Sequence, residues 1–301
     1  MLARLGLLSC LLLHGVMKCS GASLESHAMN FVQRKALARF APPSMLSSAE
    51  HTGAKPWDVH KYLAVVHHKA GVFLMITLWT QIFTALGAVD SNMGVWQQPC
   101  YANTSCQNPG APIQFWIDLY SPARAQKARE AAGPQGLRVL GPVRDPVSMI
   151  VSAYCYHHRG KEPGNIMFPS DLMMSLGPKE GLIFVAERML QMVENMTGVF
   201  EHPSNDTFRL DFEKVTSSPE LFDQEMEKVV DFLFKGLITP DERSKVINGT
   251  KIADLRQNPS SGDHANDPMC EAEVSKYVPM LPATLLGRYR SFQQRLGYAA
   301  V

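Results

Sequence analysis

Two short stretches of the sequence carry side chains that could do chemistry on an anion. The first, "VVHHKAGVF", places His68, Lys69 and Gly71 between an apolar run and a long apolar segment. A buried strand that turns sharply into a helix points main-chain N–H groups and the helix dipole at one spot. Gly71 permits the turn and the close approach of a phosphate, and Lys69 adds a mobile charge. The stretch indicates a P-loop-like phosphate site, although a buried strand–turn–helix without a ligand explains it equally well on its own.

The second stretch is "RVLGPVRDPVSMIVSAYCYHHRG". Arg144 follows a predicted strand, at the end where ligand sites of α/β proteins gather. Pro146 then starts a helix, and Ser152 lies eight residues beyond Arg144. A guanidinium and a hydroxyl so placed can converge on one phosphate. The alternative for Arg144 is a surface ion pair with Asp145 or Glu162.

Together the two stretches resemble the sulfotransferase family that uses 3′-phosphoadenosine-5′-phosphosulfate (PAPS). The strand–"HHKAG"–helix is similar to the 5′-phosphosulfate loop of that family, and "RDPVSMIVSAYCYHH" to its 3′-phosphate segment. "FRLDFEKVTSSPELFDQEMEKVVDFL" is similar to the strand, acidic turn and helix that follow. The resemblance covers roughly Lys61 to Leu233, and the Arg-Asp-Pro block with its serine is the specific part.

The resemblance implies transfer of a sulfuryl group from PAPS to a hydroxyl or amine of a carbohydrate or small metabolite. It places Lys69 at the bridging phosphosulfate oxygen, and Arg144 and Ser152 at the 3′-phosphate. Negative charge builds on the leaving phosphate, and a lysine and main-chain N–H groups suit that need because they stabilise charge where it develops. No metal is expected.

The phosphate loop departs from the family pattern, which usually has Ser or Thr where this chain has Ala70, Val72 and Phe73. Each lost hydroxyl should weaken binding by about 0.5–1.5 kcal/mol. We therefore expect a phosphate site formed by the main chain from Ala70 to Phe73, including Gly71, with Lys69 and His68. A catalytically inactive nucleotide- or glycan-binding member of the same fold is the alternative. A kinase or nucleoside triphosphatase is disfavoured because the chain lacks Gly-x-x-x-x-Gly-Lys-Ser/Thr.

The residue that removes the acceptor's proton is the second departure. Relatives carry a His-x-Pro on the strand before the Arg segment, and here the matching "IDLYSP" has no histidine. Asp118 lies two residues from Tyr120 on this predicted strand, so both side chains should point to one face. A carboxylate whose pKa is raised by burial is a sound general base. We predict Asp118 as the base; a merely solvated Asp118 is as compatible with the sequence, and the rivals are Asp90, His157 and His158.

Strand-like apolar runs alternate with helical patterns from Trp57 onward, without repeats. This pattern predicts one α/β domain, residues 57–301, with a mostly parallel central sheet flanked by helices on both faces. The predicted strands are Tyr62–Val66, Ile113–Tyr120, Leu137–Val143 and residues 207–212. The predicted helices are Leu74–Leu86, residues 122–133, a helix from Pro146, Pro219–Phe234 and a closing helix over residues 281–298.

Charge and cysteine content limit the class of protein. The 301 residues carry a net charge of +1, which gives no support to nucleic-acid binding, so any anion site must be local. Beyond a leader that would remove Cys10 and Cys19, four cysteines remain: Cys100, Cys106, Cys155 and Cys270. We expect a local Cys100–Cys106 disulfide, and no zinc site, because the spacing is not a paired Cys-x-x-Cys.

Residues 1–22 have the layout of a secretory signal peptide, with Arg4, an apolar run and Ser20-Gly21-Ala22. The run is too short to cross a bilayer comfortably, although an uncleaved membrane anchor is the alternative. Residues 23–56 are basic and rich in Ala and Ser, typical of a linker or a second targeting segment. Four sequons, at Asn103, Asn195, Asn205 and Asn248, would be open to glycosylation. We expect the secretory pathway, in the Golgi lumen or secreted, or a plastid reached through a bipartite leader.

Overall fold

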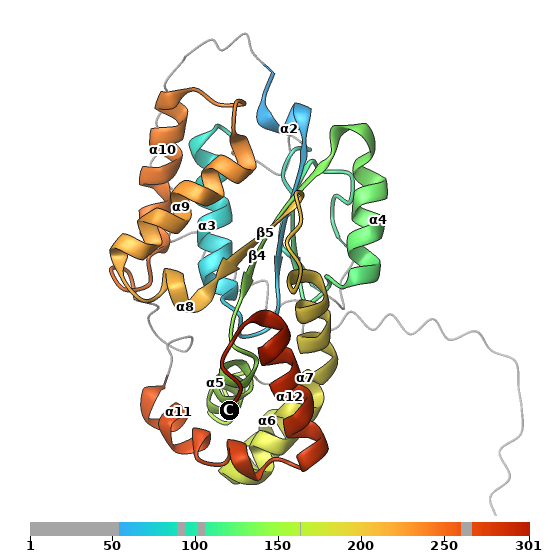
Figure 1. The fold of residues 1–301 in the computed structure, drawn as a ribbon, viewed down its shortest axis with the longest axis vertical. Helices are drawn as coiled ribbons and strands as arrows, with labels where there is room; N and C mark the ends of the chain where they lie inside the picture. The colour runs from blue at the N-terminus through green and yellow to red at the C-terminus, as the bar shows by residue number, and fades with distance from the viewer. Residues whose placement is uncertain (1–53, 89–93, 102–105, 163, 260–266) are drawn as a thin grey trace, which may run out of the picture. The chain divides into compact units, whose positions relative to one another are not determined.

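A parallel β-sheet of five strands lies at the centre of the computed structural model (Figure 1). The model describes residues 54–301, apart from 89–93, 102–105, 163 and 260–266. In spatial order the strands are β2 (Cys100–Tyr101), β3 (Ile113–Ile117), β1 (Lys61–Val66), β4 (Leu137–Val143) and β5 (Thr207–Asp211). Each neighbouring pair is parallel. The predicted α/β fold with a mostly parallel sheet is confirmed.

Burial on both faces explains the apolar composition of the central strand. No residue from Tyr62 to Val66 is more than 3% exposed, as expected for a parallel sheet covered by helices. Figure 1 shows α3 (Val72–Ala85), α9 (Pro219–Phe234) and α10 (Pro240–Thr250) on one side of the sheet and α4 (Pro122–Ala132) on the other. Rings from β1, α3 and α9 pack together on the first side.

Proline fixes the start of most helices. Pro stands at the first position of α4, α5 (Pro146–His157), α7 (Pro178–Phe200), α9, α10 and α11 (Pro268–Ser275). The N–H that proline lacks would have no partner within the helix at this position, and the fixed φ of proline is close to the helical value. The remaining described α-helices are α2 (Pro56–Val59), α6 (Ser170–Ser175), α8 (Phe212–Val215) and α12 (Ala283–Leu296). No described helix is long and apolar enough to cross a membrane.

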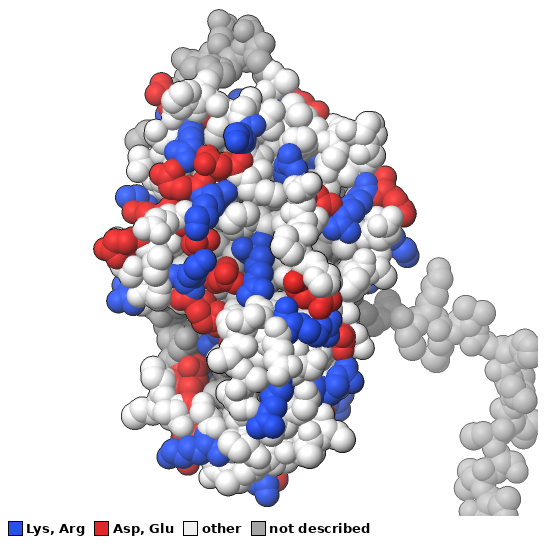
Figure 2. All heavy atoms as spheres, viewed as in Figure 1, with Lys and Arg blue, Asp and Glu red and all other residues white. Residues whose placement is uncertain are grey.

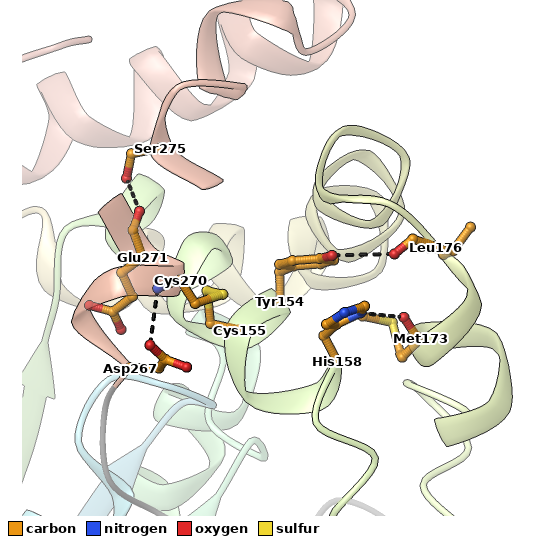
Figure 3. The surroundings of a disulfide bond; sticks show 9 residues. All are labelled: Tyr154, Cys155, His158, Met173, Leu176, Asp267, Cys270, Glu271 and Ser275. Carbon is orange, nitrogen blue, oxygen red and sulfur yellow. Dashed lines mark hydrogen bonds between the residues drawn. A yellow bond between two sulfur atoms is a disulfide. The ribbon is translucent and has the colours of Figure 1, made fainter. Parts of the chain in front are cut away.

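Helices α5, α7 and α12 pack against one another beyond the carboxyl ends of the strands (Figure 1). A disulfide between Cys155 and Cys270 joins α11 to α5 (Figure 3). The expected Cys100–Cys106 disulfide is also present. All the described residues belong to one of the two compact units of the chain, Pro42–Val301; the other unit, Met1–Ala41, lies outside the described residues, as do the predicted signal peptide and nearly all of the predicted linker.

Two predicted strands are too long: the strand over residues 207–212 ends one residue early, at Asp211, and the strand Ile113–Tyr120 ends three residues early. Strand β3 ends at Ile117 rather than at Tyr120, because Asp118 has a φ of 59° and turns the chain out of the sheet. The expectation that Asp118 and Tyr120 share one strand face is therefore wrong. Aspartate tolerates this left-handed conformation better than most residues, so its side chain is presented at the carboxyl end of β3.

Candidate functional site

The turn between β1 and α3 has a main-chain shape that only certain residues allow. Lys69 has a φ of 63° and Gly71 a φ of 107°. The N–H of Ala70 donates to the carbonyl of His67 over 2.9 Å, which closes the turn. A Cβ atom on Gly71 would lie 3.0 Å from the Phe212 ring, so both the positive φ and the limited space favour glycine. The predicted strand–turn–helix is present.

Helix α3 begins at this turn without a side-chain cap at its N-cap residue, Gly71. The first N–H groups of an α-helix have no partner within the helix and carry the positive end of its dipole. Val72 and Phe73 form the first turn, half-buried and without a hydroxyl. The start of α3 therefore offers an anion its main chain rather than side chains.

Arg144 and Lys69 meet although they lie 75 residues apart. Nη1 of Arg144 donates to the main-chain carbonyl of Lys69 over 3.1 Å. The Arg144 guanidinium also lies 4.9 Å from the centre of the Phe212 ring, and Arg144 is 8% exposed. No described carboxylate lies within ion-pair distance of this guanidinium, so the alternative of a surface ion pair is not observed. Both predicted cations line the same place at the carboxyl ends of β1 and β4.

The environment of Lys69 favours an anion. Its ammonium lies 4.0 Å from the centre of the Tyr156 ring. Burial and, second to it, the charge of Arg144 lower the pKa of Lys69 to about 8, and Glu162 partly opposes them. Burial likewise lowers the pKa of Arg144, opposed by Glu271. Two cations held together out of water would each be stabilised by a bound anion.

The face of the molecule drawn in Figure 2 has no broad basic patch that would attract an anion. On the face drawn in Figure 2, basic and acidic side chains are interspersed rather than gathered by sign. The net charge of +1 agrees with that distribution. The attraction for an anion that the described residues offer is that of half-buried Lys69 and buried Arg144.

Ser152 lies in the same helix that Arg144 precedes, but the structure does not join it to the two cations. It is the seventh residue of α5 and is 3% exposed, about 9 Å along the axis from Pro146. The start of α5 is fixed by Asp145, whose carboxylate accepts from the N–H and hydroxyl of Ser148 and from the amide of Gln293. No hydrogen bond links Ser152 to Lys69 or Arg144.

Asp118 lies against the phosphate-loop turn. Its Oδ1 accepts the main-chain N–H of His68 over 2.6 Å. Burial raises the pKa of Asp118 to about 7, and the hydrogen bond from His68 opposes this rise. A carboxylate with that pKa can take up a proton near neutral pH. Asp118 as the base stays a prediction; the structure places its carboxylate against the phosphate-loop turn through a left-handed turn that the strand pattern did not predict.

The rival bases are placed differently. Asp90 lies outside the described residues. His158 is committed to structure, because its Nδ1 donates to the carbonyl of Met173 over 2.9 Å and its ring stacks on Tyr154 (Figure 3). His157 is buried, and burial together with nearby cations lowers its pKa to about 2.

Sequence reasoning missed a cluster of rings beside this turn. His68 Nε2 lies 2.8 Å from His157 Nε2, and the Phe168 ring stacks on both imidazoles. Glu162 stands behind His157, with its Oε2 3.5 Å from His157 Nδ1. No local spacing signals this cluster, since His68 and His157 are 89 residues apart.

No group of three or more metal-ligating side chains occurs among the residues that the structure describes. No family model matches the sequence, and none of the curated proteins matches it. The fold is similar to that of mouse sulfotransferase SULT7A1 in its crystal structure with PAP. That similarity covers 80% of this chain and 89% of the other, with 8% sequence identity and a TM-score of 0.38. At this identity and TM-score, the likeness says nothing about what this chain binds or does.

Proposed function

We propose that the chain is a PAPS-dependent sulfotransferase that transfers a sulfuryl group to a hydroxyl or amine of a carbohydrate or small hydroxylated metabolite. The observation that carries the proposal is the 3.1 Å hydrogen bond from Arg144 to the carbonyl of Lys69. It joins the two motif stretches, and the charge of Arg144 adds to burial in lowering the pKa of Lys69. A donor that carries two phosphate groups can be held by two such cations through charge-assisted hydrogen bonds.

Each residue has a role in the transfer. The acceptor's oxygen or nitrogen attacks sulfur in line, a bond to sulfur forms, and the sulfur–oxygen bond to the phosphate breaks. The electron pair of that bond moves to the leaving phosphate, where the Lys69 ammonium and the N–H groups at the start of α3 stabilise it. The acceptor's proton moves to Asp118. Arg144, with Ser152 further along α5, holds the 3′-phosphate.

The compartment is part of the proposal. The Cys100–Cys106 and Cys155–Cys270 disulfides support an oxidising environment such as the Golgi lumen or the cell exterior. The sequon residues Asn205 and Asn248 are exposed, which is compatible with glycosylation there.

A second candidate function is supported by one specific observation. Ala70, Val72 and Phe73 give the phosphate loop no hydroxyl to contact a phosphate. A member of the same fold that binds the nucleotide, or a glycan, without catalysing transfer would tolerate this loss, because N–H donors alone can hold a phosphate.

Two measurements on the full chain separate these functions. Calorimetry with adenosine 3′,5′-bisphosphate measures donor-site binding, and labelled PAPS with a panel of sugar, steroid, phenol and amine acceptors measures transfer. Binding with transfer supports the sulfotransferase, and binding without transfer supports the second candidate. Absence of bisphosphate binding contradicts both nucleotide functions.

Variants assign the roles. Lys69→Ala should remove nearly all transfer, and Arg144→Ala should chiefly weaken bisphosphate binding. The matched control is Arg188→Ala on α7, which also removes a guanidinium lying over a phenylalanine ring, 5.1 Å from Phe184. Near-normal kinetics in both Lys69→Ala and Arg144→Ala would show that these residues do not have the proposed roles.

A further inference from the structure

His68, His157 and Glu162 form a cluster in which the contacts determine which ring nitrogens carry protons. None of the roles given above to residues in the transfer involves this cluster. Glu162 is held firmly: its Oε1 accepts the Tyr156 hydroxyl over 2.8 Å and its Oε2 accepts the Asn165 amide over 2.9 Å. The orientation of that amide follows from its oxygen, which accepts the N–H of Phe168 over 3.0 Å. The carboxylate therefore faces His157 in one defined position.

This position favours one of the two ring nitrogens of His157 as the carrier of the proton. An ionised carboxylate can only accept hydrogen bonds, and Oε2 of Glu162 lies 3.5 Å from His157 Nδ1. The favoured tautomer of His157 therefore has its proton on Nδ1, as for other imidazoles backed by a carboxylate. Its Nε2 is then a lone pair, and it lies 2.8 Å from His68 Nε2.

His68 must donate to that lone pair. Both imidazoles are neutral, because burial lowers their pKa values to about 3 and about 2, helped by the charges of Lys69 and, for His157, of Arg159. A neutral imidazole has one proton. With that proton on Nε2, the Nδ1 of His68 is left unprotonated. The described residues supply no hydrogen bond to this nitrogen.

The unprotonated nitrogen belongs to the residue whose main chain contacts the predicted base. The main-chain N–H of His68 donates to Asp118 over 2.6 Å. Stacking on Phe168, with ring centres 5.6 Å apart for His68 and 4.2 Å apart for His157, holds both ring planes. The charged groups that bear on the pair are Lys69 and Arg159 from their own elements and Glu162 from the following loop.

We propose that Glu162 is a positioning residue which, through His157, holds His68 in the tautomer whose Nδ1 accepts a hydrogen bond from the acceptor's hydroxyl or amine. This deepens the proposed sulfotransferase function and rests on it for the identity of the acceptor. Together with Asp118, it gives the acceptor side of the site two hydrogen-bond acceptors. A group that presents an O–H or N–H is then favoured over one that presents an ionised oxygen.

Nitrogen NMR of the histidine-labelled full chain tests the tautomer directly. The protein contains its own references: His67 Nε2 donates to the carbonyl of Tyr120 over 2.9 Å, and His158 Nδ1 donates to that of Met173. We expect the His68 signal, assigned by its loss in His68→Gln, to match the Nε2–H pattern of His67. A wild-type His68 with its proton on Nδ1 would overturn the proposal without any variant.

Three variants test the role of Glu162. Glu162→Ala removes the fixed acceptor, so His68 should become a mixture of tautomers. Glu162→Gln should retain the wild-type tautomer, because the amide oxygen can replace Oε2 while the Tyr156 hydroxyl turns to accept. Glu187→Ala, an exposed glutamate of α7, is the matched control and should change nothing.

A second route covers the case in which Glu162→Ala does not fold. His157→Phe keeps a ring beside His68 and Phe168 but removes the accepting nitrogen, so it should also release the His68 tautomer. An unchanged His68 tautomer in folded Glu162→Ala or His157→Phe would refute the positioning role.

Kinetics provide an independent reading. In Glu162→Ala we expect kcat/KM for the acceptor to fall about 2- to 12-fold, the range of one lost neutral hydrogen bond, with the KM for PAPS unchanged. Glu162→Gln should recover most of the loss. If transfer is absent with all acceptors while the tautomer is as expected, the sulfotransferase proposal fails and the tautomer assignment stands. If transfer is present but the tautomer is reversed, only the positioning role fails.

Discussion

Binding of adenosine 3′,5′-bisphosphate should change the protonation of Lys69. In the free protein, burial and Arg144 lower the pKa of Lys69 to about 8 from an ordinary value of 10.5. A phosphate beside the ammonium favours its charged form and should restore at least the ordinary pKa. The two pKa values then differ by about 2.5 units, which corresponds to about 3 kcal/mol of coupling between the proton and the ligand.

The number of protons taken up follows from these two pKa values. Free Lys69 is deprotonated to about 9% at pH 7, about 50% at pH 8 and about 90% at pH 9, whereas bound Lys69 stays charged. Binding should therefore take up about 0.1, 0.5 and 0.9 proton at these pH values. The affinity should be flat below pH 8 and fall about tenfold per pH unit above it. The ligand's own phosphates, with a second pKa of about 6, contribute little in this range.

Calorimetry in buffers with different ionisation enthalpies measures this uptake. The window from pH 8.5 to 9.5 isolates Lys69 from Asp118, whose pKa of about 7 lies below it. Lys69→Arg is the control, because its guanidinium stays charged throughout, and its uptake in this window should vanish.

The opposite result is easy to recognise. An uptake below about 0.2 proton at pH 9, with an affinity that does not change between pH 7 and pH 9, would mean that no phosphate contacts Lys69. The same uptake in wild type and in Lys69→Arg would assign the proton to another group.

Three further outcomes follow from the structure. Asp118→Asn should cut turnover yet stabilise the fold at pH 8 by about 2–4 kcal/mol, because burial raises the pKa of Asp118 to about 7, so that ionisation costs the folded state free energy that builds up between about pH 4 and about pH 7 and is complete above it; urea unfolding should show no such gain at pH 3. Cys270→Ser removes the disulfide to Cys155 and should lower the free energy of unfolding by about 2–5 kcal/mol. Faster proteolysis of α11 is a second measurement of the same effect. Gly71→Ala should cost about 1–3 kcal/mol through its positive φ, and adding Phe212→Ala should restore only part of that loss in urea unfolding.

Local signals explain what the sequence could predict. Pro122, Pro146 and Pro219 each start a helix, as expected, because proline is suited to the first helical position alone. The apolar run before His67 is the central strand, and Gly71 begins α3. These features depend on neighbours in the chain, which a sequence displays.

Contacts between distant segments form the features that the sequence alone could not predict. Cys155 and Cys270 are 115 residues apart, and nothing local pairs them. Glu162 acts on His68 only through His157, which packing of α5 against the β1–α3 turn brings within reach. The left-handed turn at Asp118 breaks the alternation of β3, because alternation assumes that a strand continues.

The disulfide between α5 and α11 tethers the C-terminal part of the chain to the helix that follows Arg144. Cys270 is the third residue of α11, and Cys155 lies three residues beyond Ser152. Glu271, the neighbour of Cys270, is thereby kept near Arg144, whose pKa is lowered by burial and raised by the charge of Glu271. Under the proposed function, the bond limits how far α11 can move away from the helix that carries Ser152 when a nucleotide enters or leaves.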